Sequence, residues 1–120
     1  MANFVNNDVF DTALNYIKNN CTHIVLLPSV IENYADIASN ELGRANAPTL
    51  TLGNGSVANS RKLEFDDTNV TISKNGDLSY IGFIDTTNSK VLAVSEIFLS
   101  KTVESGATYK ILKDSIEISL

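Results

Sequence analysis

Apolar residues near the N-terminus recur at the spacing of an α-helix. The stretch from position 8 to 19 contains Val9, Phe10, Ala13, Leu14 and Ile17. This spacing lays the five side chains along one face of a helix of about three turns. Asn or Asp residues at positions 7 and 8 are of the type that caps a helix start. The pattern predicts a helix over about residues 8–19, whose apolar face packs on the core of this domain or, alternatively, on a partner helix.

A short apolar run follows the predicted helix. Cys21–Leu27 is closed by Pro28, and its length and β-branched residues favour a strand that is buried on both faces and lies centrally in a sheet. Ser29–Glu32 then has the spacing of a capping box, and apolar residues at helical intervals continue up to Gly43. Because Asn and Ser residues interrupt this second stripe, residues 29–42 are predicted to form either a helical turn or a long packed loop.

The middle of the chain has the composition of a loop. Residues 43–60 are rich in Gly, Asn, Ala and Ser, and they predict a flexible surface segment. Gly53–Ser56 lacks the Lys of a phosphate-binding loop and the glycine spacing of a dinucleotide fingerprint. No phosphate site is therefore expected there.

The second half, residues 61–120, alternates in the manner of β-strands. Asn75-Gly76 predicts a hairpin turn ahead of the strand Leu78–Ile84. The turn cluster Asp85–Ser89 then leads into the long apolar stretch Lys90–Leu99, which is long enough to carry a bulge or a bend. We expect these two strands to pair.

Further strand signals continue to the C-terminus. Ser105-Gly106 is predicted to turn Lys101–Val103 onto Thr108–Leu112, and a last alternating strand runs from Ile116 to Leu120. Such signals recur about every 8 to 12 residues, as in antiparallel sandwiches and barrels. The predicted fold is mainly β: an antiparallel β-sandwich, jelly-roll-like or immunoglobulin-like, with an N-terminal α-helix, built as a single domain over residues 1–120.

Charge narrows the range of partners. The 120 residues include 9 Lys and Arg against 14 Asp and Glu, a net charge of −5. Such a chain is poorly suited to binding that depends on phosphate neutralisation, so we expect neither nucleic acid nor an anionic membrane as a partner. The N-terminus has no basic stretch followed by an apolar one, and no run approaches the roughly 20 apolar residues of a membrane span. We therefore expect a soluble protein, made and assembled in the cytoplasm.

The only cysteine and the only histidine lie close together. Cys21 and His23 are two positions apart, which places them on one face of a strand, where a thiolate–imidazole pair could form. One cysteine allows no internal disulfide, and the two residues are too few for a structural zinc site. A Ser-His-Asp triad would use His23, but no nucleophile-elbow glycines surround a serine. We expect a small buried thiol and a structural imidazole, and we assign no catalytic, cofactor-binding or metal-binding residue.

Acidic residues in turns are the remaining candidates for chemistry. Asp66, Asp67 and Asp85 could supply carboxylate catalysis or oxygen ligands for calcium. Because adjacent acids in turns are usually solvated, none of them is assigned to a site.

Three tyrosines suggest an alternative class of function. Tyr34, Tyr80 and Tyr109 could form the aromatic platform of a ligand- or carbohydrate-binding β-sandwich, or all three could belong to the core. This binding module is the alternative to the function that follows from the family resemblance.

The second half of the chain resembles the C-terminal half of small virion proteins of tailed bacteriophages. In Leu78–Ser95 a strand ending in an aspartate leads through a polar turn into a Lys-Val-Leu-Ala strand, and the Ser-Gly turn of Val103–Gly106 precedes the final strand. The first half is similar in outline, through Ala13–Ile17 in the helix, the acidic segment Tyr34–Asp36, and Leu42-Gly43.

The resemblance implies a structural component of the particle that is not an enzyme. It favours a capsid decoration (cement) protein that binds the major capsid protein on the outer surface of the head, stabilises the shell, and forms dimers or trimers. Its location would be the virion, assembled in the host cytoplasm. Tail and connector proteins are alternatives, and no catalytic residue is carried over.

Two features of the sequence suit such a role. The long strands of the second half offer edges to which a partner strand could add. Apolar residues near both ends of the chain could dock on a neighbour or tie into the protein's own sheet: Phe4, Val5, Ile116, Ile118 and Leu120.

Overall fold

Strands predominate in the fold, as the alternating pattern predicted. The computed structural model describes residues 4–119, apart from the side chains at positions 98 and 99. The helical elements are α1 (Asn7–Asn20), the 3-10 turn η1 (Tyr34–Asp36) and α2 (Ile37–Asn40). The strands are β1 (His23–Leu27), β2 (Gly43–Asn46), β3 (Leu50–Asn54), β4 (Ser60–Phe65), β5 (Thr68–Thr71), β6 (Gly76–Asp85), β7 (Lys90–Val103), β8 (Thr108–Ile111) and β9 (Asp114–Ser119).

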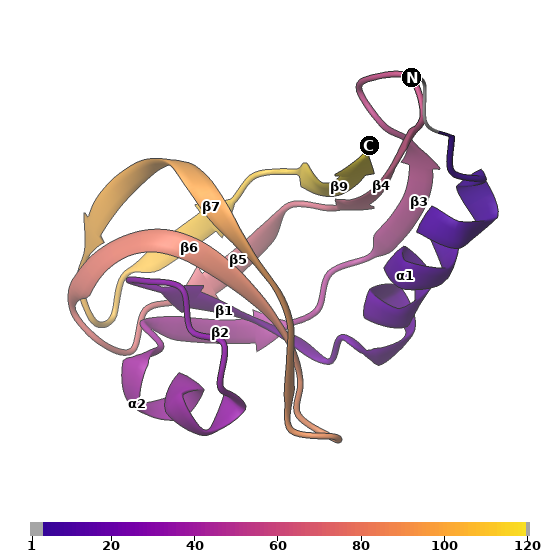
Figure 1. Ribbon diagram of the computed structural model, residues 1–120. Helices are drawn as coiled ribbons and strands as arrows, with labels where there is room; N and C mark the ends of the chain where they lie inside the picture. Colours follow the sequence, from indigo (N-terminus) through magenta and orange to yellow (C-terminus); the bar gives the residue numbers. More distant parts are fainter. Residues whose placement is uncertain (1–3, 120) are drawn as a thin grey trace.

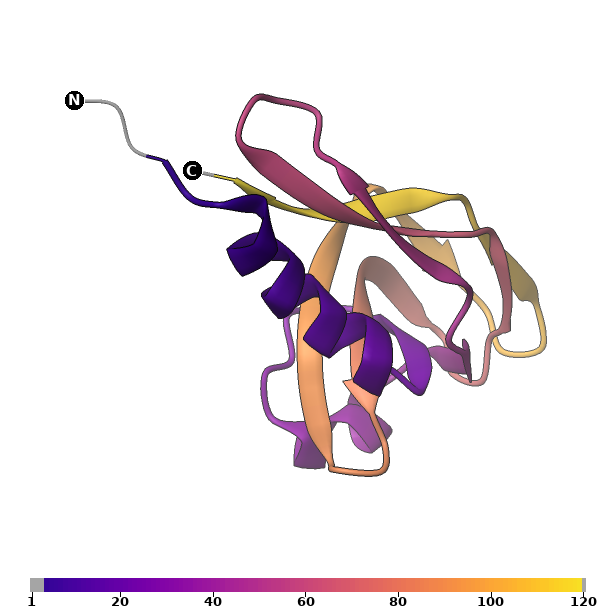
Figure 2. The same ribbon diagram turned by 90° about the vertical axis from the view of Figure 1, so that its right-hand side faces the viewer.

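The strands form three antiparallel sheets in a sandwich-like arrangement (Figure 1). The largest sheet has the order β2-β1-β6-β7, the second β3-β4-β9, and the third consists of β5 and β8. In Figure 2, α1 crosses in front of β7 and below the layer that contains β4 and β9. The prediction of a mainly-β, antiparallel fold with an N-terminal helix is confirmed.

One apolar core joins all three sheets to α1. Its buried residues come from α1 (Leu14), from β1 and β6 of the largest sheet, from β3 and β4, and from β5 and β8; they include Ile24, Leu26, Leu63, Phe65, Val70, Phe83 and Ile111. The rings of Phe65 and Phe83 lie with their centroids 5.4 Å apart and are tilted by 57°. The sheets are therefore held together by side chains that interdigitate between them.

A second core covers the opposite face of the largest sheet. Val25, Leu27 and Ile84 are buried there against Ile37 of α2. Side chains alternate between the two faces of a strand, so β1 buries its even-numbered residues in one core and its odd-numbered residues in the other. This confirms the prediction of a central strand that is buried on both faces.

The predicted N-terminal helix is present, but its cap lies one residue earlier than expected. Asn6 has extended backbone angles, and its side-chain oxygen accepts a hydrogen bond of 2.8 Å from the backbone N–H of Asp8. Asn7 is the first helical residue, so the predicted cap at Asn7 or Asp8 is wrong, whereas the chemistry of the cap is the expected one.

Residues 29–42 contain only short helical pieces. The capping-box spacing at Ser29–Glu32 does not start a helix; η1 begins after Asn33, whose side-chain oxygen accepts from the N–H of Ala35 at 3.1 Å. Ile31 packs against the second core instead of extending a helical stripe. Of the two predicted alternatives, the helical turn describes residues 34–40.

The predicted loop over residues 43–60 is wrong for most of its length. β2 pairs with β1, with Gly43 opposite Leu26, and β3 pairs with β4, with Leu50 opposite Phe65. A Cβ atom at Gly43 would lie 2.6 Å from the carbonyl oxygen of Thr71, so this glycine permits a close approach of two backbones. The loop composition was overridden by strand pairing with distant segments.

The predicted hairpin at Asn75-Gly76 is also wrong. Gly76 is the first residue of β6 and lies opposite Val103 of β7, while β5 pairs with β8 rather than with β6. Asn75 uses its side-chain oxygen to accept a hydrogen bond of 2.7 Å from the N–H of Ser105. It therefore stabilises a contact with the β7–β8 turn instead of a tight hairpin of its own.

The pairing of β6 with β7 is confirmed, and that of 101–103 with 108–112 is wrong. β6 and β7 are antiparallel across the turn at residues 86–89, with register shifts between Leu78 and Tyr80 and between Phe83 and Ile84. Gly106 has a φ of 91° and supports the predicted turn, but β8 turns onto β5 rather than onto β7. β9 confirms the last predicted strand, whose end at position 120 lies outside the described residues.

Candidate functional site

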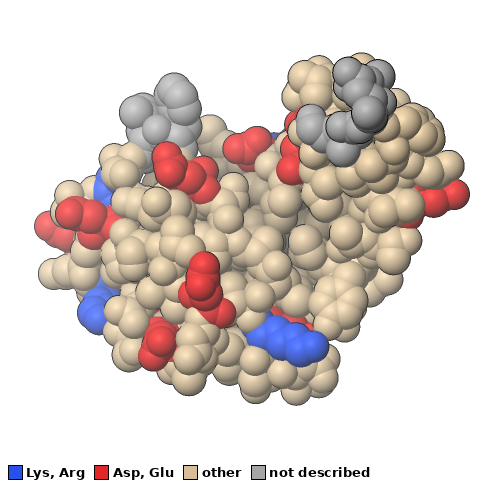
Figure 3. All heavy atoms as spheres, viewed as in Figure 1, with Lys and Arg blue, Asp and Glu red and all other residues tan. Residues whose placement is uncertain are grey.

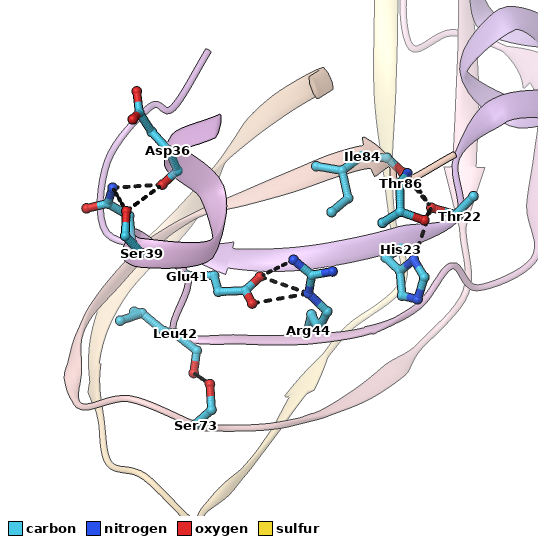
Figure 4. A network of polar contacts seen from close by, with 11 residues as sticks. Thr22, His23, Asp36, Ser39, Glu41, Leu42, Arg44, Ser73, Ile84 and Thr86 are labelled. Carbon is cyan, nitrogen blue, oxygen red and sulfur yellow. Dashed lines mark hydrogen bonds and ion pairs between the residues drawn. The ribbon is translucent and has the colours of Figure 1, made fainter. Parts of the chain in front are cut away.

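The single histidine takes part in a structural polar cluster at the start of β1 (Figure 4). Thr22 Oγ1 accepts a 2.9 Å hydrogen bond from the N–H of Thr86 and lies 3.0 Å from Nδ1 of His23. The same hydroxyl lies 2.9 Å from Oγ1 of Thr86 and donates to the carbonyl of Ile84. No serine or carboxylate shares a hydrogen bond with the His23 ring within residues 4–119, so the triad geometry is not formed there.

The single cysteine does not pair with the imidazole. Cys21 Sγ donates to the backbone carbonyl of His23 at 3.4 Å and not to its ring. Burial raises the pKa of the Cys21 thiol to about 11, against the weaker opposing effect of its backbone hydrogen bonds. The thiol is therefore protonated at neutral pH, which disfavours the thiolate–imidazole hypothesis.

The pKa of Cys21 predicts slow alkylation. The thiolate is the reactive form, so at mildly alkaline pH the folded protein should react with iodoacetamide on the order of a hundredfold more slowly than glutathione. Mass spectrometry of quenched samples measures the rate. In concentrated urea the rate should approach that of the free thiol, and a folded-state rate equal to that of glutathione would contradict the assignment.

Asp85 holds the β6–β7 turn. The residue is only 1% exposed, and its carboxylate accepts three hydrogen bonds: from the N–H of Thr87 at 3.0 Å, from the N–H of Asn88 at 3.1 Å and from Asn88 Nδ2 at 2.7 Å. The hydrogen bond from the Asn88 side chain is the main cause that lowers the pKa of Asp85 below its ordinary value of 3.8. These bonds favour the ionised form, and they assign Asp85 to the turn rather than to catalysis.

The lowered pKa of Asp85 predicts a pH-dependent effect on stability. Asp85→Asn should destabilise the protein at neutral pH, because the ionised carboxylate is stabilised only in the folded state. That contribution is present above pH 3.8 and is lost as the pH falls through the lower folded-state value. The urea midpoints of the two proteins should therefore converge below pH 3.8. Asp36→Asn, at an exposed position, is the control. A difference between the urea midpoints of the wild type and Asp85→Asn that stays constant down to low pH would contradict the stabilising role of the Asp85 carboxylate.

The adjacent acids at the β4–β5 turn are also structural. Asp67 accepts a 2.7 Å hydrogen bond from the N–H of Lys113 and lies 3.6 Å from Nζ of Lys110. Asp66 is exposed, and its carbonyl accepts from Thr68. Within the described part of the chain, no three His, Cys, Asp or Glu side chains gather closely enough to hold a metal ion.

The three tyrosines do not form one platform. Tyr34 and Tyr80 pack against the second core, whereas Tyr109 packs against the core shared by the three sheets. The ammonium of Lys101 lies 5.8 Å from the centroid of the Tyr109 ring.

The sequence did not single out Tyr16, which is 48% exposed on α1 and whose hydroxyl lies 3.1 Å from Nζ of Lys90.

Most of the apolar residues near the ends tie into the protein's own sheets. Ile116 and Ile118 of β9 pack against the shared core. The backbone of Val5 exchanges two hydrogen bonds with the side chain of Asn59, of 3.2 and 2.7 Å. Phe4 remains 78% exposed.

A groove lies where one edge strand from each of the three sheets lies close to the other two. β7, β8 and β9 each end the order of one sheet, and residues of all three line a hollow of about 230 Å³. Buried Phe65, Ile81 and Ile111 contribute apolar surface to it, and Leu112, 68% exposed, lies at its rim. The other lining residues are Ser95, Glu96, Ile97, Tyr109, Lys113 and Asp114. We refer to this hollow as the edge groove.

Of the basic side chains near the edge groove, Lys113 forms an ion pair, whereas Lys101, whose ammonium lies by the Tyr109 ring, forms none among the described residues. Lys113 Nζ lies 3.1 Å from Glu64, and the hydrogen bond to Lys113 is the first cause of the lowered pKa of Glu64. Glu96 and Asp114 at the rim have no ion pair among the residues that the structure describes. On the face drawn in Figure 3, acidic side chains are also more widespread than basic ones. The edge groove is apolar inside and carries unneutralised carboxylates at its rim.

The arrangement defines the chain as a mainly-β, sandwich-like protein in which one edge strand of each sheet lines the edge groove. No family model, curated protein or solved structure matches the chain. The helices of the described residues are too short and too polar for any of them to cross a membrane.

Proposed function

We propose that this protein is a non-enzymatic structural component of a tailed-phage virion, a capsid decoration protein that binds the outer surface of the head and stabilises it. The observation that carries the proposal is the edge groove, where free edges of three sheets meet an apolar hollow. The sequence resemblance to small virion proteins supports the choice of particle.

The dimensions of the edge groove favour a protein ligand over a small molecule. A hollow of about 230 Å³ lies below the roughly 300–1,000 Å³ of typical small-molecule sites. It suits one or a few apolar side chains of a partner, and the unpaired backbone groups of a neighbouring edge strand can bind the partner's main chain. Such binding needs no catalytic group.

The net charge of the protein supports the outer surface of the capsid shell as its binding partner. A protein of net charge −5 is repelled by the packaged genome, and it is attracted to basic patches of a major capsid protein. A homodimer or homotrimer would present two or three edge grooves to neighbouring capsid subunits, and we propose such an oligomer.

Sedimentation with empty shells tests the proposal. The purified protein is first weighed by light scattering and then mixed with tailed-phage heads that lack their decoration protein, in expanded and in unexpanded form. We expect a discrete dimer or trimer that co-sediments with expanded heads at a fixed ratio to the capsid subunit. Bound heads should also resist heating better than bare heads, because a ligand that binds only the intact state stabilises it.

Two results would reject the proposal. A monomer that stays in the supernatant with every head preparation would remove the decoration role. Binding to purified tails or connectors, with none to heads, would place the protein elsewhere in the particle.

A further inference from the structure

We propose that the edge groove binds an extended segment of its protein partner, which adds as a strand to the free edge of β9, places an apolar side chain in the hollow and brings a Lys or Arg to Asp114. This inference names the chemistry of the partner segment. It relies on the proposed function only for the source of that segment, the major capsid protein.

The apolar part of the recognition comes from exposed surface next to the core. Leu112 is one of the most exposed large apolar residues of the described chain, at 68%, and it joins β8 to β9 at the rim. Beside it, Ile97 of β7 and Tyr109 of β8 are only partly buried. An apolar side chain in the hollow would cover this surface and would touch the buried Phe65 and Ile111.

The free edge of β9 is more regular than the free edge of β7. It pairs with β4 in unbroken register, from Asp114 opposite Phe65 to Ser119 opposite Ser60, and its other side is the end of the sheet. β7 loses its regular register with β6 between Leu78 and Tyr80, and such irregularities discourage the addition of a strand. An incoming strand is therefore expected on β9.

Charge specifies a basic residue in the segment. The carboxylate of Asp114 accepts a 2.8 Å hydrogen bond from the N–H of Ser115 and has no cation beside it within the described chain, while Lys113 is neutralised by Glu64. A second copy of β9 would bring Asp114 and Glu117 and no basic residue, which adds like charge along the edge. Successive side chains of a strand point to opposite faces, so a segment with an apolar residue and, two positions away on the same face, a Lys or Arg complements the site.

Two variants and two controls isolate the groove. Leu112→Asp places a charge on the apolar rim, and Asp114→Lys reverses the charge that selects the basic residue. Val57→Asp and Asp36→Lys make the same changes at exposed positions away from the groove, in the β3–β4 loop and in η1. All four positions are exposed, so thermal unfolding should show that every variant is folded.

The probe is a synthetic ten-residue peptide with threonine at every second position and with valine and lysine in turn at the positions between, so that valine and lysine share one face of the strand. A matched peptide carries glutamate in place of lysine. Backbone NMR of the labelled protein should show shifts confined to residues 95–97 and 109–119 with the lysine peptide, and slower amide exchange along β9. The glutamate peptide should produce neither. Leu112→Asp and Asp114→Lys should each weaken binding about tenfold or more, equivalent to about 1.4 kcal/mol. The controls should bind as the wild type does.

Several results would overturn the inference. These are shifts that map outside the groove, equal binding of both peptides, no binding of the lysine peptide at millimolar concentration, or a self-association that Leu112→Asp abolishes, which would make a second copy the occupant. The same variants on phage heads separate the two proposals. If wild type and both groove variants co-sediment with heads equally, the groove inference fails and the decoration role stands. If the peptide binds at the groove and neither the wild type nor any variant binds heads, the decoration role fails and the groove inference stands.

Discussion

Phe83→Ala is expected to lower the free energy of unfolding by about 3–5 kcal/mol, the usual cost of truncating a fully buried aromatic side chain. Phe83 is 0% exposed, lies at the centre of the core shared by the sheets, and contacts the ring of Phe65. The substitution leaves a cavity between β6 and β4 that the packed neighbours fill only in part. Domains of this size have unfolding free energies of about 5–15 kcal/mol, so the variant should be folded with little stability left. Urea unfolding measures the difference.

Phe4→Ala is the matched control for this prediction. Phe4 is 78% exposed, so the same change in chemistry should alter the unfolding free energy by less than about 0.5 kcal/mol. Equal effects of the two substitutions would show that the shared core is not centred on Phe83.

Leu14→Ala is expected to cost about 2–5 kcal/mol and to detach α1 from the sheets. Leu14 is 0% exposed and is the residue of α1 that enters the shared core most deeply. Helices of this length have little stability without tertiary contacts. Hydrogen exchange should therefore show that the amides of α1 lose protection before those of β1 and β6.

Val9 on the same helix is the control for Leu14. It is 60% exposed, and Val9→Ala keeps the helix while removing no buried contact. A loss of stability comparable to that of Leu14→Ala would mean that α1 packs through its other face.

The sequence predicted the elements whose signals are local. The helix α1, the doubly buried β1 and the strand pair on either side of the Asp85 turn depend on spacings within about twenty residues, and all three are present. The predicted apolar face of α1 was too wide, because Val9 and Ala13 are exposed and only Phe10, Leu14 and Ile17 turn inward. The other strands depend on pairing between segments that are distant in the sequence. The Gly-rich and Asn-rich middle segment became β2 and β3 because distant strands offered it hydrogen-bonding partners.

The Asn75-Gly76 error has the same origin. This dipeptide is a strong hairpin signal, yet the structure uses Gly76 because a Cβ there would lie 2.7 Å from Leu42, and it uses Asn75 to bind the turn after β7. A contact between residues thirty positions apart leaves no periodicity in a single sequence.

The edge groove could not be predicted from the sequence. Its residues come from β4, β6, β7, β8 and β9, and they form a hollow only because β8 pairs with β5 instead of β7 and leaves three strand edges together. The sequence did suggest free edges in the second half. It also singled out Asp66, Asp67 and Asp85 for chemistry, whereas the structure uses Asp67 and Asp85 in turns and places Asp114 at the groove.

We propose that the edge groove is the surface that contacts the capsid. Hydrogen exchange with mass spectrometry, on the protein free and bound to expanded heads that lack their decoration protein, tests it most directly. We predict that binding slows exchange in residues 112–119 and in the adjoining part of β7, with little change in α1. Failure to bind heads, or protection centred on the exposed face of α1 around Val9 and Tyr16, would contradict the claim.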